Sequence, residues 1–133
     1  MTELREVSVV GGASLAGALG VLRIAEAAPW DLFLELGERR YSSTGDDLFE
    51  SLTSLRYALE GDGLLICVEG ARADVYPSGM SRQMGGGRRA YRHVPGRRPS
   101  RADLVDVFDA TACDEVVGVD AQLASIAQLR ARG

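Results

Sequence analysis

The amino-acid sequence predicts a single α+β domain over residues 1–133, in which a mostly antiparallel sheet carries two main helices on one face. Three observations favour this class. The chain of 133 residues is long enough for one hydrophobic core and too short for two. Its apolar content of 46% is ordinary for a globular protein. Segments with strand-like and helix-like patterns alternate, without an internal repeat or a long linker.

The first third of the chain favours strands. The stretches "REVSVV" and "VLRIAEA" are expected to be two strands joined by a Gly/Ala-rich connection. "WDLFLELG" and "ERRYSSTG" read as a hairpin that turns at Gly37-Glu38. The glycines of the first connection lack the G-x-G-x-x-G spacing of a dinucleotide-binding fold. The region also lacks the basic flank of a signal peptide, so we expect a cytoplasmic protein that does not bind a membrane.

Residues 46–60 carry the clearest helix signal. Thr44 and Asp47 suggest a capping box at its start, and the buried stripe consists of leucines at helical spacing, namely Leu48, Leu52, Leu55 and Leu59. The apolar run "LLICVEG" that follows is expected at the centre of the sheet. Its Cys67 is interpreted as a small buried apolar residue, and we expect no disulfide with Cys113.

The last third continues the alternation. "RADVY" and "RRAYRHV" are expected to be strands. Residues 103–109 fit either a short amphipathic helix, which Ser100 and Asp103 would cap, or a strand. A second main helix is expected over 120–131, with inward-facing residues at Leu123, Ile126 and Ala127.

The charge is distributed unevenly. The stretch "YPSGMSRQMGGGRRAYRHVPGRRPSR", residues 76–101, has no acidic residue and seven arginines: Arg82, Arg88, Arg89, Arg92, Arg97, Arg98 and Arg101. This segment therefore carries +7, and the rest of the chain carries −11 within a net charge of −4. We interpret the arginine-rich segment as the functional surface of an otherwise acidic protein.

Three functions are compatible with this segment. The favoured one is non-catalytic binding of another protein, because methionines beside arginines are common at interfaces. The residues expected to make this contact are Pro77, Ser78, Gly79, Met80, Met84, Gly85, Gly86, Gly87, Arg88, Arg89 and Tyr91.

The second function is an anion-binding protein or a small enzyme that holds a phosphate-bearing ligand at residues 79–92. Arg88, Arg89 and the glycine amides would supply the donors, although the chain has no Walker motif. The third is nucleic-acid binding through the arginines of residues 82–101, which the −11 of the remaining chain disfavours.

The residues offer little catalytic chemistry. His93 is the single histidine, and Cys67 or Cys113 would be its conceivable nucleophile. The triplet Asp103, Asp106 and Asp109 could hold a hard cation, although it fits the solvent-facing edge of a helix equally well. We expect neither a cofactor nor a metal, and the sequence favours a protein that is not an enzyme.

Part of the chain resembles a family of small bacterial proteins without an established activity. They share the pattern G-x-R-x-x-V-x-P-S-G-M-x-x-x-M-G-x-G-x-x-A-Y, followed by D-L-V-x-x-F-D. The matching positions include Gly70, Arg72, Pro77, Ser78, Gly79, Met80, Met84, Gly85, Gly87, Ala90, Tyr91, Asp103, Leu104, Val105, Phe108 and Asp109. The chain departs from the pattern at "CVEG", where Glu69 replaces an expected asparagine. The resemblance implies an accessory or immunity-type protein that neutralises a bacterial toxin.

Overall fold

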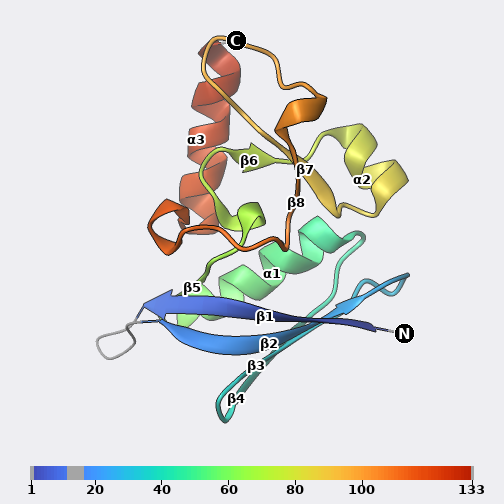
Figure 1. The fold of residues 1–133 in the computed structure, drawn as a ribbon, viewed down its shortest axis with the longest axis vertical. Helices are drawn as coiled ribbons and strands as arrows, with labels where there is room; N and C mark the ends of the chain where they lie inside the picture. Colours follow the sequence, from blue (N-terminus) through green and yellow to red (C-terminus); the bar gives the residue numbers. More distant parts are fainter. Residues whose placement is uncertain (1, 12–16, 133) are drawn as a thin grey trace.

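The computed structural model describes residues 2–11 and 17–132 as one mixed α+β domain, as the sequence predicts. Its larger sheet is antiparallel, with the strand order β4-β3-β2-β1-β5 (Figure 1). The strands are β1 (Thr2–Gly11), β2 (Ala18–Ala25), β3 (Leu32–Leu36), β4 (Arg39–Ser43) and β5 (Leu64–Ile66). The predicted strand pair and hairpin are therefore confirmed, while the predicted Gly/Ala connection lies largely outside the described residues.

The second sheet is small and also antiparallel. Its order is β6-β7-β8, formed by Val75–Tyr76, Arg89–Arg92 and Leu104–Asp106. The first two are the strands expected from "RADVY" and "RRAYRHV", and β7 lies within the arginine-rich segment. The third resolves the alternatives for residues 103–109: a 3₁₀ turn at Arg101–Asp103 leads directly into a strand.

Helix α1 (Leu48–Gly61) lies on one face of the five-stranded sheet (Figure 1). It begins at Asp47, whose carboxylate accepts a hydrogen bond from the amide of Glu50 at 2.7 Å. The predicted leucine stripe is buried and packs on inward-facing strand residues such as Leu22 and Leu34. The side chains between α1 and the sheet form the centre of the hydrophobic core.

Helix α3 (Val119–Arg132) lies on the same side of the large sheet, beyond α1, and contacts α1 and β6 (Figure 1). The predicted range is confirmed, but two of its predicted inward residues are wrong, because Leu123 is 45% exposed and Ala127 is also exposed. The buried positions are instead Val119, Gln122 and Ile126. The polar Gln122 can be buried because backbone carbonyls accept hydrogen bonds from its side-chain amide.

Two further expectations for the centre of the chain are wrong. Strand β5 pairs with β1 alone in the large sheet and therefore lies at its edge. Cys67, which follows β5, forms a disulfide with Cys113 across 46 residues of sequence. The amide of Thr111 donates to the carbonyl of Cys67, and this bond brings the two segments side by side.

Within the described ranges, no helix is both long and apolar enough to cross a membrane.

Candidate functional site

The arginine-rich segment contains a helix that the sequence did not reveal. Helix α2 (Gly79–Gly85) begins at Ser78, whose hydroxyl accepts a hydrogen bond from the amide of Ser81 at 3.0 Å. It ends at Gly86 in the left-handed conformation, with φ of +64°. Seven residues are too few to show helical periodicity, and the Pro-Ser-Gly and triple-glycine flanks suggest turns.

The glycines after α2 allow it to pack closely against the domain. A Cβ atom on Gly86 would lie 2.9 Å from the ring of Trp30. A Cβ atom on Gly87, where φ is +73°, would lie 2.8 Å from the carboxylate of Asp47. The carbonyl of Gly86 also accepts a hydrogen bond from the amide of Leu48 at 2.7 Å. The glycine run therefore fastens α2 to the start of α1.

The same contacts weaken the anion-cradle interpretation of residues 79–92. The amides of Gly86 and Gly87 both donate to the carbonyl of Ser81, and the amide of Arg88 donates to Gly85. Amides that are already bonded do not converge on an anion. The carboxylate of Asp47 beside Gly87 would also repel a phosphate.

Four of the seven arginines pair with carboxylates of the chain itself. Arg88 lies 2.9 Å from both Glu3 and Asp106, and its guanidinium stacks on the ring of Phe108. The remaining pairs are Arg82 with Asp47 at 3.6 Å, Arg97 with Asp103 at 2.7 Å, and Arg92 with Glu69. In contrast, Arg89, Arg98 and Arg101 have no carboxylate within 4.0 Å in the described part of the chain.

These pairs shift the titration of the carboxylates. The guanidinium of Arg97, helped by the amide of Ser100, lowers the pKa of Asp103 to about 2. Burial opposes ionisation of Glu3, but hydrogen bonds from Arg5 and Arg88 outweigh it and lower the pKa of Glu3. The arginine-rich segment is thus an ordered part of the domain, in which most of the charge is neutralised.

The methionines of α2 are the most exposed large apolar side chains described. Met80 is 70% exposed and Met84 is 83% exposed. They are four residues apart on a helix and therefore lie on the same side of it. Gly79 and Gly85 face open space.

A cavity of about 460 Å³ adjoins this helix. The predicted residues that line it are Pro77, Ser78, Met80 and Tyr91, joined by His93, Arg98, Pro99 and Arg130. The other predicted contact residues, Gly79, Met84, Gly85, Gly86, Gly87, Arg88 and Arg89, do not line it. Arg130 comes from the end of α3, and its guanidinium lies 5.3 Å from the ring centre of Tyr76. Arg130 reaches the cavity through the packing of α3, and its position in the sequence does not indicate this.

His93 lies at the edge of this cavity and is partly buried. Its Nε2 atom is shielded from solvent and has no hydrogen-bond partner among the described residues. Burial lowers the pKa of His93 below its usual 6.5, so the imidazole is neutral at pH 7. Because Cys67 and Cys113 are bonded to each other, neither is a free nucleophile for it.

The aspartates proposed for a hard cation are occupied by arginines. Asp103 binds Arg97, Asp106 binds Arg88, and Asp109 accepts a 2.8 Å hydrogen bond from Arg5. Within residues 2–11 and 17–132, no three His, Cys, Asp or Glu side chains are grouped as metal ligands would be.

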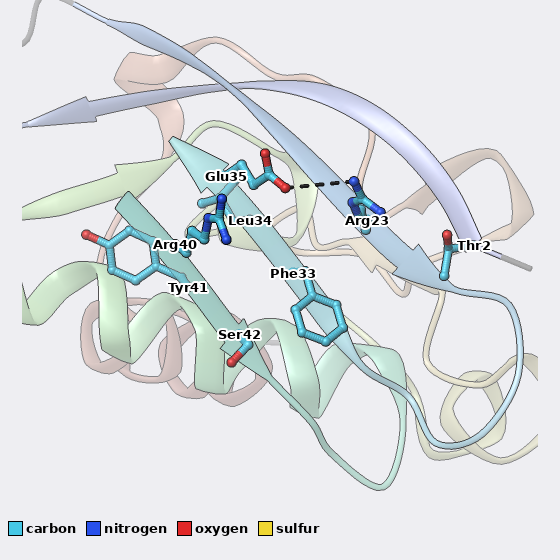
Figure 2. A pocket seen from close by; sticks show the side chains of 8 residues that line it. All are labelled: Thr2, Arg23, Phe33, Leu34, Glu35, Arg40, Tyr41 and Ser42. Carbon is cyan, nitrogen blue, oxygen red and sulfur yellow. Dashed lines mark ion pairs between the residues drawn. The ribbon is translucent and has the colours of Figure 1, made fainter. Parts of the chain in front are cut away.

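The outer face of the large sheet, opposite α1, carries a second hollow of about 600 Å³ (Figure 2). Arg23, Phe33, Glu35 and Arg40 lie around it. Apolar inward and exposed outward residues alternate along β2 and β3, but the sequence does not show which outward residues of different strands become neighbours.

No protein family model matches the chain, and no curated protein matches it. The resemblance to immunity-type proteins therefore stays a prediction.

Proposed function

We propose that the chain is a non-catalytic protein-binding domain whose contact surface is formed by α2 and the adjoining cavity. The observation that carries this proposal is the exposure of Met80 and Met84 on a helix whose C-terminal glycines pack against Trp30 and Asp47. The helix backbone is already ordered before binding, and the flexible thioethers of the two methionines can adapt to a partner's shape.

The surrounding charge defines the partner's chemistry. Arg98 and Arg130 line the cavity, and no acidic residue lines it. A partner that places an apolar segment on the methionines and carboxylates near these arginines would match both features. From the resemblance, a bacterial toxin that this chain neutralises is the candidate partner.

Nucleic acid is a poorer match for the same surface. Counterion release requires several arginines that are free to meet phosphates. Four of the seven arginines are already engaged by carboxylates, and the chain as a whole carries a net charge of −4. The remaining cations suit a few acidic side chains better than a phosphate backbone.

The test begins with affinity capture by the tagged full chain from a lysate of the source organism. The captured protein is purified, and its dissociation constant is measured for the wild type and for Met84→Asp. Loss of an interface hot spot would weaken binding roughly thirtyfold. Leu123→Asp, on α3 outside the cavity and 45% exposed, is the matched control. Equal binding by wild type and Met84→Asp, or the absence of any captured protein, contradicts the proposal.

The cavity favours a second candidate function, which is binding of a small organic anion. Its walls combine apolar Pro77 and Pro99 with the cationic Arg98 and Arg130. Calorimetric titration with benzoate and with inorganic phosphate tests this directly. Arg130→Gln should weaken binding at least about tenfold, the effect of losing one charged hydrogen bond. Arg101→Gln, outside the cavity, is the control, and equal affinities for both variants would contradict an anion site here.

A further inference from the structure

The outer face of the five-stranded sheet carries two rows of outward side chains that cross β1 to β4, and the pair Ser8 and Leu19 lies beside them. The strand register aligns Leu4, Arg23, Phe33 and Ser42 in one row across β1 to β4. It aligns Glu6, Val21, Glu35 and Arg40 in the next. Paired residues of an antiparallel sheet point to the same side, so these rows form one continuous surface.

This surface is unusually apolar for a solvent-facing sheet. Leu4 is 60% exposed, Leu19 64%, Val21 42% and Phe33 49%. The helices all lie on the other side of the sheet, so none of them covers these residues (Figure 1). An antiparallel sheet with one solvated face normally alternates apolar inward and polar outward residues. Large apolar residues on both faces indicate that the outer face meets another surface.

The charges of the two rows sum to zero. Arg23 and Arg40 are balanced by Glu6 and Glu35, and Arg23 lies 3.8 Å from Glu35 across the strands (Figure 2). The face is therefore neutral and carries both signs, although the chain has a net charge of −4. A second copy of the chain can meet such a face without net repulsion. Two copies of the cationic cavity beside α2 would repel each other.

We propose that two copies of the chain associate through this sheet face, related by a twofold axis. In an isologous contact every charge meets residues of the same surface, so a face with two arginines and two glutamates can satisfy itself. Leu4, Leu19, Val21 and Phe33 of each copy form the apolar centre, packed as two sheets pack face to face. The proposal is independent of partner binding at α2.

Sedimentation equilibrium of the full-length chain over a wide concentration range tests the association. The wild type is expected to reach twice the mass of the 14.2 kDa chain. Phe33→Asp should raise the dimer dissociation constant roughly thirtyfold, as for an interface hot spot. Leu19→Asp should act in the same direction. Leu123→Asp on α3, where the side chain is 45% exposed, is the matched control and should leave the dimer intact.

Charge exchange gives a sharper test of the geometry. A chain with Arg23→Glu and Arg40→Glu and a chain with Glu6→Arg and Glu35→Arg should each be monomeric alone. Mixed in equal amounts they should form a heterodimer, because each supplies the charges that the other lacks. Circular dichroism establishes that every variant is folded. A monomeric wild type, a dimer that survives Phe33→Asp, or folded exchange variants that fail to pair would each overturn the proposal.

Discussion

The guanidinium of Arg56 donates to the Oε1 atom of Gln122 across 2.7 Å, and both side chains are almost fully buried. The same guanidinium donates to the carbonyls of Gly70 and Val117. The amide nitrogen of Gln122 reaches three carbonyls, those of Gly70, Arg72 and Val75. One polar pair thus joins α1 and α3 to the chain that leads into the small sheet. Burial lowers the pKa of Arg56 to about 10.

Replacing Gln122 with leucine should be severely destabilising. The volume is similar, but the substitution leaves the Arg56 cation short of an acceptor and takes the Gln122 amide donor from the carbonyls of Arg72 and Val75. Losing a hydrogen bond to a buried charge typically costs about 1.5–3 kcal/mol of unfolding free energy, and leaving a buried polar group unpaired costs about 1–3 kcal/mol. Urea denaturation of Gln122→Leu measures this cost. Gln128→Leu, on the exposed side of the same helix, is the control and should change stability by less than about 0.5 kcal/mol. Equal stabilities for the two variants would refute the role of the pair.

The Cys67–Cys113 bond should contribute measurably to stability. It closes a loop across 46 residues, and such cross-links typically add about 2–4 kcal/mol by restricting the unfolded chain. Urea unfolding with and without a thiol reductant should therefore show a lower midpoint in the reduced protein. The double variant Cys67→Ala/Cys113→Ala provides the baseline, because its midpoint should not respond to reductant. A wild-type midpoint unaffected by reductant, with free thiols shown by titration, would contradict this contribution.

His93 should make the protein less stable as the pH falls below 6.5. Its folded pKa is below the unfolded value because burial and the nearby Arg130 outweigh the hydrogen bond to the backbone of Tyr76 and the charges of Asp74 and Asp103. Between the folded pKa and 6.5, the unfolded state binds more protons, so lowering the pH favours unfolding. Above pH 6.5 both states are neutral, and this contribution vanishes.

Two measurements check the lowered pKa of His93 and its effect on stability. As the only histidine, His93 gives one set of imidazole NMR signals, whose titration midpoint should lie below 6.5. His93→Phe should reduce the loss of stability between pH 6.5 and pH 5 relative to the wild type. An NMR midpoint at or above 6.5 would show that the ring is not held in its neutral form.

Local patterns were enough to predict much of the fold. Alternation along β2 and β3 sets which residues are buried, and the leucine stripe of α1 survives because the helix lies flat on the sheet. The predictions that were wrong concern residues whose surroundings are formed by distant parts of the chain. Gln122 is buried because carbonyls 47 to 52 residues away meet it, and no periodicity in α3 signals that.

The candidate site was predicted in composition but not in arrangement. The arginines of residues 76–101 suggest a free basic surface, yet Arg88 is engaged by Glu3, 85 residues away, and by Asp106, 18 residues away. Arg130 joins the cavity only because α3 ends beside β6. Pairing between such distant residues is a tertiary property, so charge counting overestimates how much of the segment is available to a ligand.

The attachment of α2 to the domain can be tested at its glycines. Gly86→Ala places a methyl group 2.9 Å from Trp30 at a residue with positive φ, and the left-handed conformation alone costs about 1–2 kcal/mol for a residue with a side chain. Stability should fall by at least that amount, and the fluorescence of Trp30, the single tryptophan, should change as its packing is lost. Gly85→Ala is the matched control, because that position, the last residue of α2, faces open space and has no positive φ, so alanine should not destabilise it. If both substitutions behaved alike, α2 would not be held by this contact, and its methionines would lack the fixed position on which partner binding depends.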